Sequence, residues 1–420
     1  MSRNQVSQPA LLFAVVLLTP ILLAALLIIM RKIQVRAQRD HVAWRVPIES
    51  LSLSVRGQLE VGADGTVFSL SAGQLRAILP TSGVSWKSEV MGYEPAGTSA
   101  PTICSDQDSV YACTSTHLSS FAKEPSAASN PLGSSQVVNR EADWTVTWPS
   151  SQYVTLAIHE EQLFLMAGKT LFAYTIEGEL RWMAGFPSYS TSCLGVDQAG
   201  TVFVTITGIG VTGMTNCELI AIGGSGQELW CVKGLEQATD MVVQHDRIHL
   251  ATIGGLYCYD TTGKKQWVSH IGWLSQIAVA ESGITYYRKE SSTEVCALDS
   301  EGNILWKQDC GLQSAVVSVA TSGPVVAGDQ VLVGTGDLLP PPPPSRIQSL
   351  LLRLGLRAFT LIRHSNEQGR LMALDPTTGS ILWSNTVNEQ LSGGLDVDTE
   401  AGRCAAYACG QYSIYAFSAD

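Results

Sequence analysis

The sequence predicts an all-β protein, an eight-bladed β-propeller with tryptophan-docking motifs, preceded by one N-terminal transmembrane helix. Three observations predict this: an uncharged apolar stretch near the N-terminus, a Gly-to-Trp motif that recurs at blade-sized intervals, and repeated polar turns that precede alternating apolar strands. The chain has 420 residues, of which 45% are hydrophobic and 15% charged, with 38 Gly. This composition is typical of a folded protein and excludes a collagen-like or coiled-coil chain.

The first predicted element is a membrane anchor. Residues 10–30 are ALLFAVVLLTPILLAALLIIM and carry no charge, and as a helix they would span roughly 30 Å, the thickness of one bilayer core. A cleaved secretory signal is the alternative, but the apolar run is longer than such signals usually have. We therefore expect an N-terminal tail at 1–9, a retained transmembrane anchor at 10–30 and a basic juxtamembrane linker at 31–40.

The second element is a repeat built around tryptophan. A small residue is followed by a turn that ends in Gly and, three or four residues later, by Trp, as in ALDPTTGSILW from Ala373 to Trp383. Intervals between successive Trp residues are 58, 38, 48, 37, 39 and 77, which is a blade-sized period with two insertions. The Trp residues of these copies are Trp86, Trp144, Trp182, Trp230, Trp267, Trp306 and Trp383. The turn glycines are Gly83, Gly178, Gly226, Gly263, Gly302 and Gly379.

A second signal counts the blades independently. Polar turns followed by alternating apolar residues are typical of hairpins, and they occur at 62–68, 105–111, 158–164, 196–203, 243–250, 280–286, 326–333 and 398–407. These eight turns outnumber the seven motif tryptophans, so one Trp strand must come from elsewhere. HVAWRVPI at 41–48 contains Trp44 and has no blade before it. We expect 41–48 to pair with 403–420 and close a propeller that occupies 41–420, since a closed ring leaves few exposed sheet edges.

The recurring Trp has a structural explanation. A twisted four-stranded blade cannot bury both faces alone, and an indole packed against a small Ala of the neighbouring blade would fill the wedge between them. The Gly would supply the backbone conformation of the tight turn before the last strand. All eight Trp residues are therefore expected to be docking residues of the core. Trp148 and Trp273 lie outside the pattern.

The motif Ala-x-Asp-x-x-Thr-Gly-x-x-x-Trp, complete at Ala373, Asp375, Thr378, Gly379 and Trp383, resembles the docking motif of pyrroloquinoline-quinone-like (PQQ-like) eight-bladed propellers. The resemblance covers 41–420. It implies either a quinoprotein dehydrogenase or a cofactor-free binding propeller, such as the scaffold of the outer-membrane β-barrel assembly machinery.

The resemblance also allows the enzyme alternative to be tested on residues. PQQ-dependent dehydrogenases use an adjacent Cys-Cys disulfide over the quinone, a calcium site and a catalytic Asp on a longer chain. No two of the ten Cys here are adjacent, and eight blades use almost all the residues after the anchor. We therefore expect no catalytic residues, no cofactor and no metal, and a scaffold for protein contacts. PQQ and calcium belong to the alternative of a dehydrogenase, and a ligand-sensing propeller is a further alternative.

Charge restricts the partners. The net charge is −11, and residues 41–420 carry 21 basic and 36 acidic groups, a net of −15. Such a surface repels phosphate backbones, so nucleic acid is excluded as the expected partner. Cationic or amphipathic proteins fit better.

The orientation of the anchor is predicted by two signals that conflict. Arg31, Lys32, Arg36 and Arg39 follow the apolar stretch and place the propeller in the cytoplasm by the positive-inside rule. The resemblance to exported propellers favours the opposite side. We expect a single-pass cell-membrane protein with an extracytoplasmic propeller.

Three further features are candidates for function. Cys104 with Cys113 and Cys217 with Cys231 lie around hairpin turns and are candidate disulfides, although Cys is also a common buried residue in packed strands. His245 and His249 flank a turn and are expected to be solvent-exposed rather than a zinc pair.

The insertion at 337–369 in blade seven contains PPPPP and a basic amphipathic stretch with Arg346, Arg353, Arg357 and Arg363. It could contact a membrane or partner, or cover the propeller rim. A second insertion, 124–136, is Ser/Pro-rich.

Overall fold

The structure is a computed structural model of the chain. It describes residues 42–47, 58–62, 64–71, 73–79, 83–92, 102–123, 137–149, 154–186, 190–209, 215–289, 292–311, 317–338, 367–389, 391, 394–398, 405–409 and 413–418. Within these ranges the chain forms β-strands and no helix.

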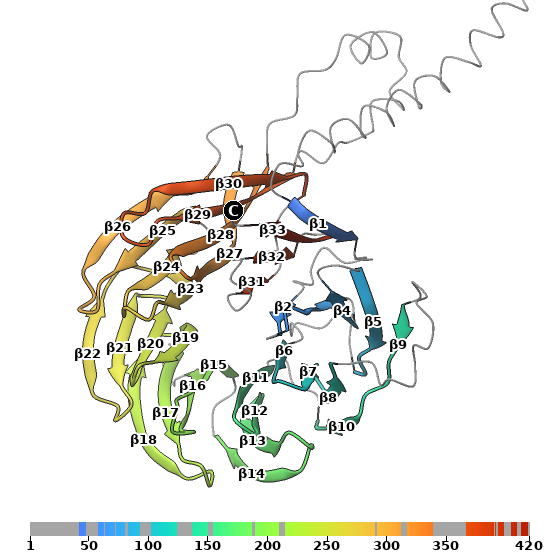
Figure 1. Cartoon of the computed structure of the whole chain (residues 1–420). Helices are drawn as coiled ribbons and strands as arrows, with labels where there is room; N and C mark the ends of the chain where they lie inside the picture. The colour runs from blue at the N-terminus through green and yellow to red at the C-terminus, as the bar shows by residue number, and fades with distance from the viewer. Residues whose placement is uncertain are drawn as a thin grey trace, which may run out of the picture.

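Eight antiparallel sheets stand side by side around a central axis (Figure 1). The prediction of an all-β, eight-bladed propeller is confirmed. Each blade has an inner, a second, a third and an outer strand, and the inner strands of successive blades contact one another around the axis. We number the blades one to eight by their inner strands in chain order.

The inner and second strands form the hairpin that begins each blade. The inner strands of blades one to eight are β2 (Gln58–Val61), β6 (Thr102–Ser105), β11 (Val154–His159), β15 (Ser190–Val196), β19 (Ala238–Gln244), β23 (Leu274–Val279), β27 (Val317–Ala327) and β31 (Leu395–Asp398). The second strands are β3 (Val67–Ser71), β7 (Ser109–Cys113), β12 (Gln162–Ala167), β16 (Val202–Ile209), β20 (Arg247–Thr252), β24 (Thr285–Lys289), β28 (Gln330–Leu338) and β32 (Ala405–Cys409). The eight hairpins are those that the polar turns predict.

The third and outer strands complete each blade. The third strands are β4 (Gln74–Leu79), β8 (His117–Ala122), β13 (Thr170–Thr175), β17 (Thr215–Ile222), β21 (Leu256–Asp260), β25 (Glu294–Leu298), β29 (Glu367–Leu374) and β33 (Ser413–Ser418). The outer strands are β5 (Gly83–Glu89), β10 (Trp144–Thr147), β14 (Leu180–Gly185), β18 (Glu228–Leu235), β22 (Lys265–Ser269), β26 (Ile304–Asp309), β30 (Ile381–Val387) and β1 (Val42–Pro47). Each outer strand carries one motif Trp.

Blade eight joins the two ends of the described chain. β1 pairs antiparallel with β33, with Trp44 opposite Ala416 and Arg45 opposite Tyr415. The sheet order is β1-β33-β32-β31, so the first described strand is the outer strand of the last blade. β1 therefore covers the outer edge of β33, which would otherwise be unpaired.

Blade one carries an additional strand that the sequence analysis does not predict. After β8 the chain returns to blade one, where β9 (Val138–Asn139) pairs parallel with β5 through Trp86 and Val138. It then continues into β10 of blade two. The outer edge of blade one is therefore covered by the chain itself.

The hydrophobic core lies between neighbouring blades. One cluster unites Phe68 and Leu75 of blade one with Val110 and Phe121 of blade two, and all four are fully buried. In strand β12, five of six residues are buried because both faces pack against other blades. After its first residue, β12 accordingly has a continuous apolar sequence, as expected for a strand covered on both sides.

Some predicted segments lie outside the described residues. These are the anchor at 10–30 with its flanks, the Ser/Pro-rich stretch at 124–136 and the part of the blade-seven insertion that holds Arg346, Arg353, Arg357 and Arg363. The insertion leaves the blade between β28 and β29. None of the described segments is a helix with the length and hydropathy needed to cross a bilayer.

Candidate functional site

The repeated motif forms a joint between each blade and the next, and the Asp of the motif shapes the turn. Asp299 Oδ1 accepts hydrogen bonds from the backbone N–H groups of Glu301 (2.9 Å) and Asn303 (2.8 Å). In blade seven, Asp375 Oδ1 accepts from Thr377 N (2.9 Å) and Thr378 N (2.7 Å). Such Asx turns are the reason that Asp recurs here.

The next residue of the turn binds the indole of the preceding blade. Trp306 Nε1 of blade six donates to the carbonyl of Pro376 in blade seven (2.9 Å), and Trp267 Nε1 of blade five donates to Ser300 O in blade six (2.9 Å). Equivalent bonds join Trp86 to Lys123 O (3.1 Å), Trp144 to Ile176 O (3.0 Å) and Trp230 to Thr261 O (3.0 Å). The motif of one blade thus receives the Trp of the blade before it.

The turn glycine lies directly against that indole. Gly302 has φ of +87°, and a Cβ built on it would lie 2.6 Å from Trp267 Cε3. Gly379 has φ of +72°, and its Cβ would lie 2.5 Å from Trp306 Cε3. The position therefore requires Gly for two reasons, a left-handed backbone and the close approach of the ring. Gly178, Gly226 and Gly263 meet Trp144, Trp182 and Trp230 in the same way.

A β-bulge precedes the motif Trp in every blade except blade two, where β10 begins at Trp144. In blade six, Ala297 pairs with Trp306 and Leu298 with Ile304, so Leu305 is the extra residue. The same irregularity precedes the Trp of blades one, three, four, five, seven and eight. A bulge redirects the side chains of its strand. The structure differs from the expectation in one respect: the small Ala is the cross-strand partner within the same blade, and the neighbouring blade contributes Gly and a carbonyl.

Some joints depart from the pattern. Trp383 Nε1 donates to Gln330 Oε1 of its own blade (3.1 Å). Trp182 Nε1 is buried without an acceptor among the described residues. Gly83 is the first residue of β5 and Trp44 belongs to β1. Of the two Trp residues outside the motif, Trp148 is buried, whereas Trp273 is 56% exposed.

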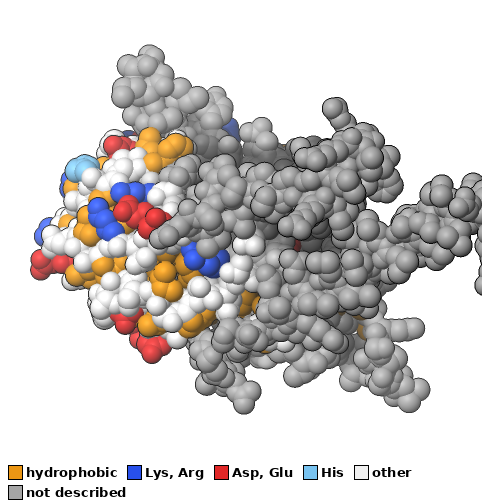
Figure 2. All heavy atoms as spheres, turned by 90° about the horizontal axis from the view of Figure 1, so that it is seen from above, with side chains coloured by type: hydrophobic (Ala, Val, Ile, Leu, Met, Phe, Trp, Pro, Cys, Tyr) orange, Lys and Arg blue, Asp and Glu red, His pale blue; other side chains and the backbone are white. Residues whose placement is uncertain are grey.

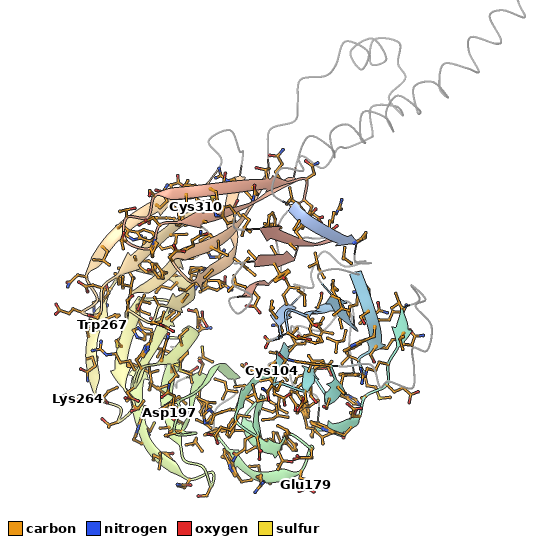
Figure 3. All side chains as sticks on the ribbon, viewed as in Figure 1. Cys104, Glu179, Asp197, Lys264, Trp267 and Cys310 are labelled. Atoms are coloured by element: carbon orange, nitrogen blue, oxygen red, sulfur yellow. The ribbon has the colours of Figure 1, made fainter. Side chains whose placement is uncertain are left out.

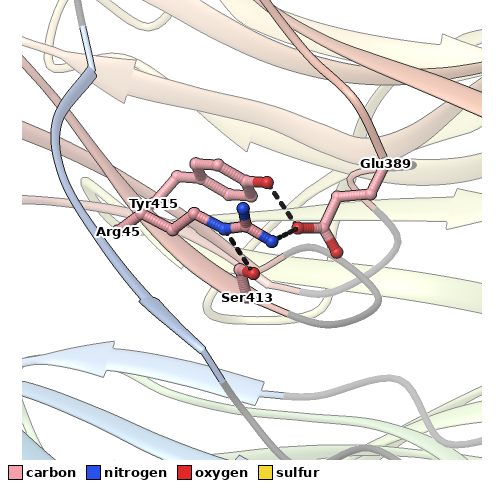
Figure 4. A network of polar contacts seen from close by, with 4 residues as sticks. All are labelled: Arg45, Glu389, Ser413 and Tyr415. Carbon is pink, nitrogen blue, oxygen red and sulfur yellow. Dashed lines mark hydrogen bonds and ion pairs between the residues drawn. The ribbon is translucent and has the colours of Figure 1, made fainter. Parts of the chain in front are cut away.

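Blade eight has a polar network where β1 closes the ring (Figure 4). Arg45 Nε donates to Ser413 Oγ (2.6 Å), and Arg45 Nη2 lies 3.3 Å from Glu389 Oε1. Tyr415 donates its hydroxyl hydrogen to the same carboxylate oxygen, and the guanidinium carbon is 5.5 Å from the centre of the Tyr415 ring. Glu389 is 4% exposed. Burial, together with the Glu389 carboxylate, raises the pKa of Tyr415 far above its ordinary value.

Acidic side chains connect inner strands near the axis. Asp396 Oδ2 of blade eight accepts from Val61 N of blade one (2.8 Å), and Glu60 Oε1 of blade one accepts from Ser105 N of blade two (3.2 Å). Asp240 joins blade five to Ile277 of blade six in the same way (2.9 Å). Burial, and after it the Asp396 carboxylate, raise the pKa of Glu60 to about 7. Burial raises the pKa of Asp240 to about 6.

The candidate disulfides are not formed. Cys104, Cys113, Cys217 and Cys231 are free cysteines. The strand register explains this, because Cys104 pairs with Tyr111 while Cys113 pairs with Thr102, and Cys217 pairs with Leu235 while Cys231 pairs with Ile220. Neither pair stands directly opposite, as a cross-strand bridge requires. In Figure 3, Cys104 lies toward the centre of the ring, and Lys264 and Glu179 lie at its outer rim.

The expectation of two exposed histidines is wrong for His249. This side chain is 2% exposed, its Nδ1 lies 3.0 Å from Thr285 Oγ1, and its ring meets Trp267 edge-on with centroids 5.9 Å apart. Burial, and after it Arg247, lower the pKa of His249 to about 4. His245 lies in the turn with φ of +50°. His249 therefore supports the Trp267 joint as a neutral side chain.

Two further features bear on ligand binding. A groove of about 730 Å³ lies between blades one and two, lined by Ser88, Glu89, Ser119, Arg140 and Thr145 among others. Its walls mix both charges. Among the residues that the structure describes, no group of three or more His, Cys, Asp or Glu side chains could hold a metal ion.

The eight sheets and their docking motifs form an eight-bladed β-propeller that is similar to PQQ-like propellers. The PQQ_2 family model, described as outer membrane protein assembly factor BamB, matches residues 252–339. The crystal structure of BamB from Moraxella catarrhalis is similar, with a TM-score of 0.56, 17% identity, and coverage of 89% of this chain and 100% of that one.

An enzyme structure is similar as well. Quinohemoprotein alcohol dehydrogenase from Comamonas testosteroni has a TM-score of 0.60 and 12% identity, and the match covers 90% of this chain and 76% of that one. A search of curated protein sequences found no match. At these identities, the two structures show the shared fold.

Proposed function

We propose that this chain is a membrane-anchored, non-catalytic propeller that serves as a scaffold for protein interaction or assembly, held in the membrane by residues 10–30 with the propeller on the extracytoplasmic side. The observation that carries the proposal is the use of the motif residues. The indoles of blades five and six and the turn carboxylates of blades six and seven bond to the protein's own backbone, so they hold the ring together.

The comparisons support the same proposal. The matching family model is described as an assembly factor, and the matched residues 252–339 include the motifs of blades five and six. A rigid ring with loops on both faces offers large surfaces to partners. The acidic balance of residues 41–420 favours cationic partners.

A quinone-dependent oxidoreductase is the second candidate, favoured by the similarity to the quinohemoprotein dehydrogenase. The two functions predict different results for the purified full chain. Incubation with PQQ and calcium, followed by an alcohol and an artificial electron acceptor dye, should give no dye reduction above a heat-denatured control. Calcium-dependent dye reduction would show that the chain is an enzyme.

The scaffold itself is tested in the cell. Photo-crosslinking amino acids placed at exposed positions of several blades should yield crosslinks to one defined protein from a limited sector of the ring. Crosslinks scattered evenly around the ring, or absent from all positions, would contradict a scaffold. Protease treatment of spheroplasts tests the orientation, because an extracytoplasmic propeller should be digested and a cytoplasmic one protected.

A further inference from the structure

Large apolar side chains project into solvent from several outer strands. They occupy the two positions immediately before the motif Trp and are 44–51% exposed. The residues are Leu180 in blade three, Leu229 in blade four, Ile304 and Leu305 in blade six, and Ile381 and Leu382 in blade seven. In Figure 2, which views the wheel edge-on, hydrophobic side chains lie on the described rim among acidic and basic ones.

The fold does not require apolar residues at these positions. Blade five forms the same bulge and the same Trp joint with Lys265 and Gln266 in place of Ile304 and Leu305. Blade one has Ser85 at the bulge. Among the bulged blades of the described chain, only blades six and seven place large apolar side chains at both positions. Exposed apolar surface that packing does not explain is typical of an interaction site.

The two pairs lie on the outer strands of successive blades, on either side of one blade-to-blade joint. Trp306 follows Ile304 and Leu305 directly and lies on Gly379, two residues before Ile381. Its Nε1 also bonds to Pro376 O in blade seven. The apolar pairs therefore flank one blade-to-blade joint.

Acidic residues lie in the turns that precede both apolar pairs. Asp299 and Glu301 lie in the turn before Ile304, and Asp375 lies in the turn before Ile381. Backbone and side-chain hydrogen bonds from Asn303 lower the pKa of Asp299, and the Thr377 hydroxyl, followed by the Thr378 N–H, lowers the pKa of Asp375 to about 2. Both groups stay negative at neutral pH. The two turns and the strands β26 and β30 contain one basic side chain, Lys307, which follows Trp306.

We propose that the rim patch, defined as Ile304, Leu305, Ile381 and Leu382 with Asp299, Glu301 and Asp375, binds a cationic amphipathic segment of a partner protein. Leu or Ile side chains of the segment cover the apolar residues, and its Lys or Arg side chains face the turn carboxylates. This inference rests on the proposed scaffold function and names the surface and the kind of partner. Charge complementarity selects a cationic segment.

The test uses the full chain in detergent and a fluorescent synthetic peptide of alternating Leu and Lys. Fluorescence anisotropy should show saturable binding, and the double variant Leu305→Gln/Leu382→Gln should weaken it by about tenfold because apolar area is no longer buried. Leu229→Gln is the matched control, since Leu229 has the same bulge position and is 51% exposed. That variant should bind as the parent does. A Leu/Glu peptide should not bind.

Five outcomes would overturn the inference: unchanged binding by the double variant, equal weakening by Leu229→Gln, equal binding of the Leu/Glu peptide, a patch occupied by a second copy, or a patch occupied by residues 339–366. Size-exclusion chromatography and a variant lacking 339–366 reveal the last two. If the inference fails while in-cell crosslinks from another sector persist, the scaffold stands and only this surface is wrong. If both fail, the scaffold falls too.

Discussion

The joint between blades six and seven and the closure of blade eight achieve the same end by different chemistry. In blade six, Ala297 pairs with Trp306 nine residues later, and the joint consists of an indole, a glycine and a carbonyl. In blade eight, Trp44 pairs with Ala416 from the other end of the propeller, and a buried carboxylate binds Arg45 and Tyr415. Between blades six and seven the chain is continuous, and the repeated motif alone forms the joint. The closure of blade eight has an additional network of charged and polar side chains.

Chain entropy explains the difference. The cost of bringing two residues together grows with the logarithm of their separation, so pairing Trp44 with Ala416 costs roughly 3 kcal/mol more than pairing Ala297 with Trp306. The additional hydrogen bonds and the ion pair of blade eight oppose this cost. The two regions should therefore fail differently when they are mutated.

The largest effect is expected from Gly302→Ala. The added Cβ would lie 2.6 Å from Trp267 Cε3, and the residue would have to keep a φ of +87°, which L-residues rarely adopt. We therefore expect a loss of about 3 kcal/mol in the free energy of unfolding. Urea denaturation of the full chain in detergent measures it. Gly185→Ala is the control, since nothing lies within 4 Å of its Cβ, and it should change stability little. Equal stabilities for both variants would contradict the role of the glycine at the joint.

A smaller effect, of about 2 kcal/mol, is expected from Glu389→Ala, because the buried Tyr415 hydroxyl and Arg45 lose their shared acceptor. The position of proteolytic cleavage distinguishes Glu389→Ala from Gly302→Ala. Limited proteolysis should cleave near β1 sooner in Glu389→Ala than in Gly302→Ala, where β1 keeps its network. Glu301→Ala, which removes an exposed carboxylate, should behave as the parent. Identical cleavage patterns in the two destabilised variants would show that closure and joints are one unit.

The smallest effect concerns pH and the inner strands. Glu60 has its pKa raised from 4.5 to about 7, so the folded state holds this proton more tightly than the unfolded state. Its stabilising contribution is complete below pH 4.5 and is lost as the pH rises to about 7. Glu60→Gln keeps an acceptor for Ser105 and should flatten the fall in unfolding free energy between pH 5 and 8. An unchanged slope would contradict the assignment.

The sequence analysis and the structure agree on the parts that repeat. The eight polar turns and the motif Trp residues predict eight blades, because each turn and each motif depends on local backbone geometry. The partner of the indole was harder to predict. Ala297 and Gly302 belong to the same motif. The bulge at Leu305 places Ala297 opposite Trp306 within blade six, whereas Gly302 contacts Trp267 of blade five.

Other features depended on registers that no local pattern reveals. The Cys104 and Cys113 turn looked suitable for a bridge, but the register places the two thiols on different cross-strand pairs. His249 looked exposed beside its turn, but β20 places it against Trp267 and Thr285. β9 was missed because its two residues gain their pairing only when blade two lies beside blade one.

The sequence by itself determined the number of blades, the position of each Trp and Gly, and the acidic charge, because these follow from short-range turn chemistry and composition. Only the tertiary structure decided which residues meet across blades, such as Trp306 with Gly379 and Arg45 with Glu389. Such contacts join residues far apart in the chain, and their geometry is set by how the sheets pack around the axis.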